Sequence, residues 1–234
     1  MSEIHFIGGE KGGVGKSIVA RLLAQYFIDR EIKWQGFDGD LSHGALMRYY
    51  SDFASPLDLD RLEAMDGLIE ATAELEDARV LVDLAAQSEQ RLHAWIEEAA
   101  IAELCSELGI GLVFWHVMDD GKDSVTLLQR LLSRYGDSVR YVIVQNALRG
   151  DNFDLFEQSE AHAAARELGT PMMSLRALHH PIMKKIDQLD QSFWAASNNP
   201  SWADKGLGLM ERQRVKVWMR NAYDEFDRLG LASD

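Results

Sequence analysis

Short apolar runs alternate along the chain with longer segments in which apolar positions recur at the period of a helix. This alternation is typical of a parallel sheet that is covered by helices. The apolar runs predict strands at residues 4–8, 33–37, 80–84, 111–117, 141–145 and 172–175. The periodic segments predict helices that include residues 17–30, 89–108, 122–135 and 155–168. We therefore expect an α/β protein with a mostly parallel sheet flanked by helices on both faces.

Two regions follow neither pattern clearly. Residues 42 to about 77 mix short helical pieces with turns, and residues 190–204 carry Phe193, Trp194 and Trp202 among Ser, Asn and Pro. The second region is predicted to be a long loop, whose aromatic side chains pack into the protein's own core or, alternatively, form a partner surface. No repeat, low-complexity tract or Pro/Gly-rich linker divides the chain. Residues 1–234 are therefore predicted to form a single domain.

Composition narrows the classes to which the chain can belong. With 234 residues, 47% hydrophobic and 26% charged, it can bury one substantial core. The single cysteine, Cys105, excludes an internal disulfide and a Cys-rich metal framework, and its helical context predicts burial. No stretch is apolar enough to cross a bilayer, and the first residues lack a signal-peptide pattern, so we expect a cytoplasmic protein that binds no membrane. The net charge of −14 argues against nucleic acid binding by the surface as a whole.

A glycine-rich loop joins the first predicted strand to the first predicted helix: residues 11–17 are Lys-Gly-Gly-Val-Gly-Lys-Ser. Glycines allow the close approach and positive φ angles with which backbone N–H groups surround a phosphate chain, and the helix adds its positive dipole end. In the general phosphate-loop motif the lysine reaches the β- and γ-phosphates and the serine hydroxyl ligates Mg²⁺. Glu10 replaces the first glycine of that motif. The loop nevertheless predicts a nucleotide site made by Gly12, Gly13, Val14, Gly15, Lys16, Ser17 and Ile18.

Lys11, a second lysine at the start of the loop, separates it from the general motif. The heptad Lys-Gly-Gly-x-Gly-Lys-Ser resembles the deviant phosphate loop of the ParA/MinD family of ATPases. The resemblance implies a single-domain P-loop NTPase that hydrolyses ATP slowly with Mg²⁺ and forms a homodimer when ATP is bound. It also implies that Lys11 crosses the dimer interface to contact the partner's nucleotide, so that Lys11 and Lys16 both act in catalysis. The alternative is a solvated lysine that only adds positive potential.

Two carboxylate motifs stand where such an ATPase needs them. Asp38 and Asp40 look like the family's switch I motif Asp-x-Asp, and Asp83 ends an apolar strand as the Walker B aspartate does. By this resemblance Asp83 holds Mg²⁺ through water, Asp40 orients the attacking water, and Asp38 supports either the magnesium shell or the loop. The alternative for each is a helix N-cap or a loop residue. The family's proline after the Walker B aspartate is missing, because residues 84–87 are Leu-Ala-Ala-Gln.

Asn146 follows the strand at 141–145 and resembles the asparagine that contacts adenine in the family. An amide can both donate to and accept from the adenine edge, although asparagine at a strand end is also a common turn residue. A guanine-recognising Asn-Lys-x-Asp is absent, since residues 147–149 are Ala-Leu-Arg, and ATP is therefore expected rather than GTP. One cysteine is too few for the iron–sulfur carriers of the superfamily, and the length excludes the two-domain arsenical-pump ATPases.

Three functions are compatible with the resemblance. The first is a plasmid or chromosome partition ATPase, whose ATP-bound dimer binds DNA non-specifically and is activated by a centromere-binding or other partner protein. The second is a conjugation or positioning ATPase that acts through protein partners without binding DNA. A membrane-bound MinD-like ATPase ranks last, because residues 224–228, Asp-Glu-Phe-Asp-Arg, do not form the basic tail that it needs.

One segment near the C-terminus is locally basic. Between residues 205 and 220, five basic residues stand against the single acid Glu211, which gives a local charge of +4. The basic residues are Lys205, Arg212, Arg214, Lys216 and Arg220. In a helix, those at 212, 216 and 220 line one face, while Val215, Trp218, Met219 and Ala222 dock the helix to the protein. The segment predicts either a DNA-binding face or the solvated outer face of a docking helix.

Overall fold

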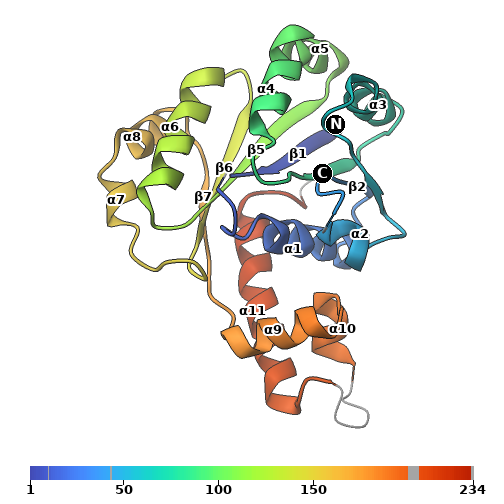
Figure 1. The fold of residues 1–234 in the computed structure, drawn as a ribbon, viewed down its shortest axis with the longest axis vertical. Coiled ribbons are helices and arrows are strands. Elements are labelled where there is room, and N and C mark those ends of the chain that lie inside the picture. The colour runs from blue at the N-terminus through green and yellow to red at the C-terminus, as the bar shows by residue number, and fades with distance from the viewer. Residues whose placement is uncertain (10, 43, 200–205, 233–234) are drawn as a thin grey trace.

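Each of the six apolar runs forms a strand of one parallel sheet (Figure 1). The structure, a computed structural model, describes residues 1–9, 11–42, 44–199 and 206–232. The strands are β1 (Glu3–Gly8), β2 (Trp34–Asp38), β3 (Ala54–Pro56), β4 (Arg79–Asp83), β5 (Gly111–Met118), β6 (Arg140–Asn146) and β7 (Met172–Leu175). All seven are parallel, in the order β3-β2-β4-β1-β5-β6-β7. The predicted α/β class is confirmed, and the sheet is wholly parallel.

The sequence does not predict the seventh strand, β3. It has only three residues and pairs with β2 alone, at the edge of the sheet. Alternation cannot be recognised over three residues, and Pro56 argues against a strand unless the strand lies at an edge, where the missing N–H is not needed. The described part of the segment from 42 to 77 otherwise contains two helices, Ala45–Tyr49 and Leu62–Ala73.

Helices cover both faces of the sheet, as predicted. One face is covered by α1 (Lys16–Asp29), α2 (Ala45–Tyr49) and α11 (Leu209–Arg228), and the core on this face is extended by α9 (His180–Gln188) and α10 (Phe193–Asn198). The other is covered by α3 (Leu62–Ala73), α4 (Glu89–Glu98), α5 (Ile101–Leu108), α6 (Lys122–Tyr135), α7 (Asp154–Glu157) and α8 (Glu160–Glu167). Successive strand side chains point to opposite faces, so that Ile4 and Phe6 of β1 join one core and Ile7 joins the other. Figure 1 shows α9 and α10 beside α11, beyond the end of the sheet.

Two predicted helices are each interrupted. The helix predicted at 89–108 ends at Glu98, and Ala100 has a φ of 48° before α5 begins. No glycine or proline lies at that break, so the residue types did not predict it. The helix predicted at 155–168 is divided by Ser159, whose hydroxyl accepts a hydrogen bond from the backbone N–H of His162 and caps α8.

The loop predicted at 190–204 is wrong over its described part, because residues 193–198 form α10. Ser192 caps this helix by accepting a hydrogen bond from the Ala195 N–H. Phe193 is fully buried, as expected, but 49% of Trp194 is exposed. Trp202 and the rest of the segment from 200 to 204 lie outside the described residues. Cys105 is buried, which confirms the expectation for the cysteine.

The order of the strands decides where a ligand can bind. β1 lies in the middle of the sheet, with β4 on one side and β5 on the other, so the chain connections run in opposite directions from it. In open parallel sheets this reversal leaves a crevice at the carboxyl ends of the strands. The glycine loop follows β1 at that end. Within the described residues, none of the helices is both long enough and apolar enough to cross a membrane.

Candidate functional site

The glycine loop leaves the carboxyl end of β1 and enters α1 through Gly15. Gly9 and Gly15 have φ angles of 121° and 103°, which disfavour any residue with a side chain. A Cβ at Gly9 would lie 2.5 Å from the Val117 carbonyl oxygen, whereas a Cβ at Gly12 or Gly13 would meet nothing within 4 Å. The loop is therefore tight against the sheet and open on the side where a phosphate chain would bind. Gly9 was not among the predicted site residues.

The first turn of α1 carries no acidic residue, and its N-cap residue, Gly15, provides no side-chain cap. Its positive dipole end is therefore available to an anion. Val14 is buried and Ile18 packs partly against the core, so these two residues hold the loop and helix in place. The backbone N–H groups of Ile18 and Val19 both donate to Gly15 O.

Lys16 is 8% exposed. Its Nζ donates to Gly9 O at 2.8 Å and to Lys11 O at 3.3 Å, and it hydrogen-bonds only these carbonyl oxygens among the described residues. Burial lowers the pKa of Lys16, and the charges of Asp83 and Glu89 oppose that shift. A buried ammonium bonded to neutral acceptors gains strongly from a phosphate oxygen. This arrangement agrees with the predicted phosphate contact.

Ser17 and Asp83, two of the predicted metal ligands, lie close together, and the Ser17 side chain lowers the pKa of the Asp83 carboxyl. Asp83 is 3% exposed, and its Oδ1 has no hydrogen-bond partner in the described part of the chain. Burial and then the charge of Asp38 raise the pKa of Asp83 to about 7. A carboxylate oxygen without a partner, beside a hydroxyl, is a donor set that suits Mg²⁺, and the charge of the ion would favour the ionised carboxylate. The residues present therefore fit the predicted magnesium site.

Asp38 pairs with Asp83 across β2 and β4, but its carboxylate is used within the protein. Oδ1 accepts the Asp40 N–H and Oδ2 accepts the Met47 N–H, each at 3.1 Å. Burial raises the pKa of Asp38, and these backbone hydrogen bonds oppose the rise. Asp38 thus supports the loop that leads into α2, which is the second of the two roles predicted for it. Asp40 is partly exposed at the start of this loop, and its Oδ1 accepts the Ser42 N–H.

Asn146 is fully buried against the glycine loop rather than open to a base. Its Nδ2 donates to Val14 O at 2.7 Å and its Oδ1 accepts the Leu148 N–H at 3.1 Å. A Cβ at Gly15 would collide with this amide, so the packing also explains why position 15 is glycine. In this structure Asn146 positions the loop, and contact with adenine requires one of these hydrogen bonds to open.

Lys11 points back to its own subunit. Its Nζ lies 2.6 Å from Asp119 Oδ2, and this hydrogen bond raises the pKa of Lys11. Asp119 follows β5 and also accepts hydrogen bonds from Ser124 Oγ and the Gly121 N–H. An ion pair so well supported fixes the lysine, and the predicted contact with a second subunit needs this pair to open.

Glu89, the first residue of α4, is a site residue that the sequence analysis missed. Its Oε1 accepts the Gly9 N–H at 2.9 Å, while the carbonyl of the same Gly9 accepts from Lys16. Glu89 and Lys16 therefore hold one peptide unit of the loop from both sides. The available signal was a glutamate six residues after Asp83, at the predicted start of a helix.

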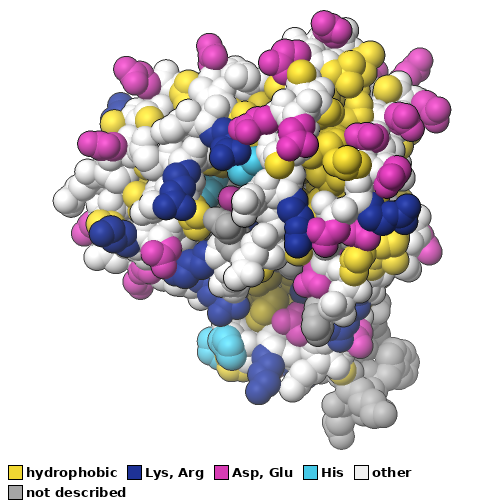
Figure 2. Space-filling model, turned by 45° about the horizontal axis from the view of Figure 1, so that its top comes forward, with side chains coloured by type: hydrophobic (Ala, Val, Ile, Leu, Met, Phe, Trp, Pro, Cys, Tyr) yellow, Lys and Arg dark blue, Asp and Glu magenta, His cyan; other side chains and the backbone are white. Residues whose placement is uncertain are grey.

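The predicted basic residues lie on α11, far along the chain from the loop. Val215, Trp218, Met219 and Ala222 are buried, so the docking face of α11 is confirmed. Arg214, Lys216 and Arg220 are exposed, and Arg212 is partly buried and donates to Asn199 O. Lys205 lies outside the described residues. Acidic side chains are scattered over the face shown in Figure 2, and the net charge of the whole chain is −14.

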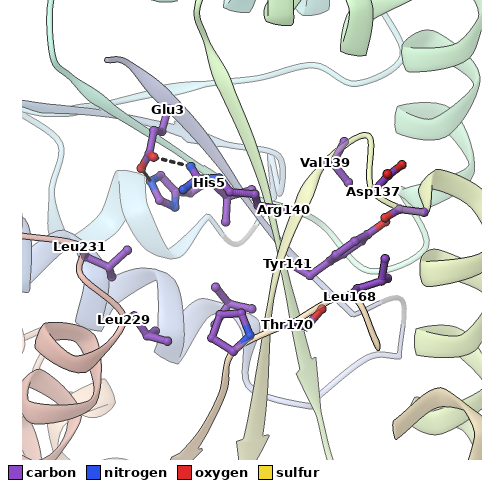
Figure 3. Close-up of a pocket in the computed structure, with 15 residues that line it drawn as sticks. Glu3, His5, Asp137, Val139, Arg140, Tyr141, Leu168, Thr170, Leu229 and Leu231 are labelled. Carbon is purple, nitrogen blue, oxygen red and sulfur yellow. Dashed lines mark hydrogen bonds and ion pairs between the residues drawn. The ribbon is translucent and has the colours of Figure 1, made fainter. Parts of the chain in front are cut away.

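A cavity of about 330 Å³ lies at the opposite end of the sheet, where β1, β5, β6 and β7 begin (Figure 3). Glu3, His5 and Arg140 form its polar side, and Leu229 and Leu231 belong to its apolar wall. None of the predicted site residues lines this cavity.

No protein-family model matches the chain. It is 27% identical to Protein TraL of Escherichia coli, over 97% of this chain and 98% of that protein, and 26% identical to Protein MobD of Acidithiobacillus ferrooxidans, over 94% of each.

Two solved structures share the fold. One is the septum site-determining protein MinD of Pyrococcus horikoshii OT3, complexed with Mg-ADP (TM-score 0.54, 15% identity, 100% of both chains). The other, from Borrelia burgdorferi B31 and bound to AMPPNP, is described as a plasmid partition protein (TM-score 0.52, 13% identity, 97% of this chain and 99% of that one). The resemblance predicted from the glycine loop is confirmed: the chain is a ParA/MinD-like protein in its fold, with sequence relatives in TraL and MobD.

Proposed function

We propose that this protein is an ATP-binding and ATP-hydrolysing switch that dimerises with ATP and acts in plasmid or chromosome partition. The observation that carries the proposal is the pair of unsatisfied groups beside the open glycine loop. The ammonium of Lys16 is bonded only to carbonyls, and Asp83 Oδ1 has no partner among the described residues. Such groups gain most from a bound phosphate chain and its metal ion.

Each residue then has a defined task. The loop N–H groups and Lys16 bind the phosphates, and Lys16 leaves Gly9 O to do so. Ser17 and Asp83 would hold the magnesium ion, which would supply positive charge against the phosphates. Asp40 orients the attacking water, from a loop whose start is fixed by Asp38.

Dimerisation places Lys11 at the nucleotide of the second subunit. In the structure Lys11 is paired with Asp119, so the γ-phosphate of the partner's ATP has to replace a carboxylate that is already present. Only a nucleotide that carries a γ-phosphate can replace Asp119 as the partner of Lys11, and association of the subunits therefore depends on ATP. The pair between Lys11 and Asp119 would keep the subunits apart in ADP.

The proposal includes non-specific DNA binding through Arg212, Arg214, Lys216 and Arg220 of α11, which a dimer presents twice. A centromere-binding or other partner protein would activate hydrolysis. The likeness in fold to a protein described as a plasmid partition protein supports this proposal. The alternative is a conjugation or positioning ATPase that acts through protein partners without binding DNA.

Light scattering with ATP and with ADP tests the switch. Asp40→Ala should block hydrolysis and accumulate dimers in ATP, and adding Lys11→Ala should return them to monomers. Lys33→Ala, at an exposed lysine beside the amino end of β2, is the matched control and should leave the dimer intact. The same mass with both nucleotides and in all variants would contradict the mechanism.

A further inference from the structure

A groove of about 550 Å³ runs between α10 and α11 and reaches the end of α1. Trp194 and Asn198 line it from α10, and Lys216, Arg220 and Asp224 line it from α11. The groove contains two of the cations assigned above to DNA binding. It also contains an aromatic side chain that the basic-helix hypothesis does not use.

Trp194 is unusual among the tryptophans that the structure describes. Half of it (49%) is exposed, whereas the exposed fractions of Trp34, Trp95, Trp115 and Trp218 range from 0% to 8%. Phe193, the preceding residue of α10, is fully buried and anchors the helix by packing on Trp218 at a ring-centroid distance of 5.0 Å. Trp194 is therefore presented to solvent by a helix that is itself fixed.

Lys216 and Arg220 have no hydrogen bond or ion pair with any other described residue, although carboxylates are abundant in this chain. They lie four residues apart on one face of α11, about 6 Å along the helix axis. The nearby Asp29 carboxylate forms no ion pair with either cation among the described residues, and it accepts hydrogen bonds from Gln25 Nε2 and Tyr223 Oη. Asp224 and Arg30 also line the groove.

We infer that this groove binds a single strand of nucleic acid, with one base stacked on Trp194 and the neighbouring phosphates on Lys216 and Arg220. A flat indole beside a row of cations suits a polymer that alternates bases with phosphates, and every base has a face that can stack. In duplex DNA the faces of the bases are covered by their neighbours, so Trp194 contributes only to single strands. The inference takes its class of ligand, DNA, from the proposed function and rests on it for that choice.

The test compares three probes by fluorescence anisotropy, each with Mg-ATP and with Mg-ADP: labelled oligo(dT), the oligo(dA)·oligo(dT) duplex, and polyglutamate. Trp194→Ala should weaken oligo(dT) binding about tenfold and duplex binding less than about twofold, since stacking on a single base is lost. Trp194→Phe should restore most of the affinity for oligo(dT). Leu155→Ala on α7, where the side chain is also 49% exposed, is the matched control and should change nothing.

The charge arm replaces Lys216 and Arg220 by Glu, with Arg166→Glu on α8 as the matched control. The double substitution of Lys216 and Arg220 should abolish binding of both nucleic acids. Arg166→Glu should have little effect on either. Circular dichroism melting of each variant shows whether the fold is retained.

Several outcomes separate this inference from the proposed function. Duplex binding that needs ATP, without oligo(dT) binding, overturns the inference and supports the proposed function. Binding of oligo(dT) that Trp194→Ala weakens, without duplex binding in ATP, supports the inference and counts against partition. If Trp194→Ala weakens oligo(dT) binding and duplex binding equally, the inference is overturned. It is also overturned if polyglutamate binds as tightly as oligo(dT), which would favour an acidic protein partner. If neither nucleic acid binds, both fail.

Discussion

Two carboxyl groups, partly buried Glu3 and buried Asp83, lie at opposite ends of the same pair of strands and have opposite surroundings. Glu3 begins β1 beside Arg79 of β4, and Asp83 ends β4 beside Ile7 of β1. Burial alone would raise the pKa of Glu3, but contacts with His5 and Arg140 lower it to about 2. The pKa of Asp83 is raised to about 7 by burial and by the charge of Asp38.

The two ends of the sheet are therefore built for different purposes. At the amino end, Arg79 pairs with Glu3. Arg140 and His5 also contact the Glu3 carboxylate (Figure 3), and His5 Nε2 lies 3.2 Å from it. That carboxylate needs no ligand to be stable. At the carboxyl end Asp83 is left without enough partners, which costs stability that only a bound cation or proton returns. Such local destabilisation is expected at a site that binds a ligand, and not in a structural cluster.

Removing the charge at the amino end should have the largest effect on folding. The lowered pKa of Glu3 means that its ionised form contributes stability above about pH 4.5, and that this contribution is lost as the pH falls toward 2. Glu3→Gln should therefore cost about 2 kcal/mol at pH 7 in urea unfolding, and less as the pH falls through this range. Nucleotide affinity should not change. A loss of equal size throughout the range would point to packing instead of charge.

The same change at the carboxyl end should have the opposite sign. The pKa of Asp83 is raised in the folded protein. Its contribution to stability is therefore fully present below about pH 4, where the carboxyl is protonated in both the folded and the unfolded protein. This contribution is lost as the pH rises through about 7. In metal-free buffer at pH 8, Asp83→Asn should therefore stabilise the fold by about 1 kcal/mol, with little difference near pH 4. Thermal melting at the two pH values measures this. Destabilisation at pH 8 would mean that Asp83 is a structural residue like Glu3.

The smallest effect is expected at Glu89, which lies beside the glycine loop at the carboxyl end of the sheet. Glu89→Ala removes the acceptor for the Gly9 N–H and should weaken ATP binding by roughly fivefold, as one hydrogen bond is worth about 1 kcal/mol. Glu89→Gln keeps an acceptor at that position and should restore binding to within about twofold. Equal losses in the two variants would show that the charge of Glu89, not its hydrogen bond, positions the loop.

Sequence patterns predicted the elements that are long and regular. The amphipathic pattern gave α6 its bounds, 122–135, and the buried runs gave every strand but β3, which is too short to show a period. The helix breaks at Ala100 and Ser159 depend on how the helices pack. Such packing cannot be predicted from the type of a single residue. Local patterns also could not show that α10 would form among Ser and Asn, because its stability comes from Phe193 against Trp218.

The candidate site was predictable where chemistry and spacing are both fixed. The glycine loop, Lys16, Ser17 and Asp83 come together as expected, because all depend on where strands end. The partners of the remaining residues were not predictable. Asn146 against Val14, Lys11 against Asp119 and Glu89 against Gly9 join segments at least 80 residues apart, and only the folded sheet brings them together.

Calorimetric titration of Mg-ATP into the wild type, Lys16→Ala and Glu3→Gln tests most directly whether the carboxyl end of the sheet is the nucleotide site. Hydrogen bonds to charged groups are worth about 1.5–3 kcal/mol, so Lys16→Ala should weaken binding between roughly tenfold and a hundredfold. The wild type and Glu3→Gln should bind with equal affinity. A Lys16→Ala variant that binds as tightly as the wild type, or a wild type that does not bind Mg-ATP, would contradict the account.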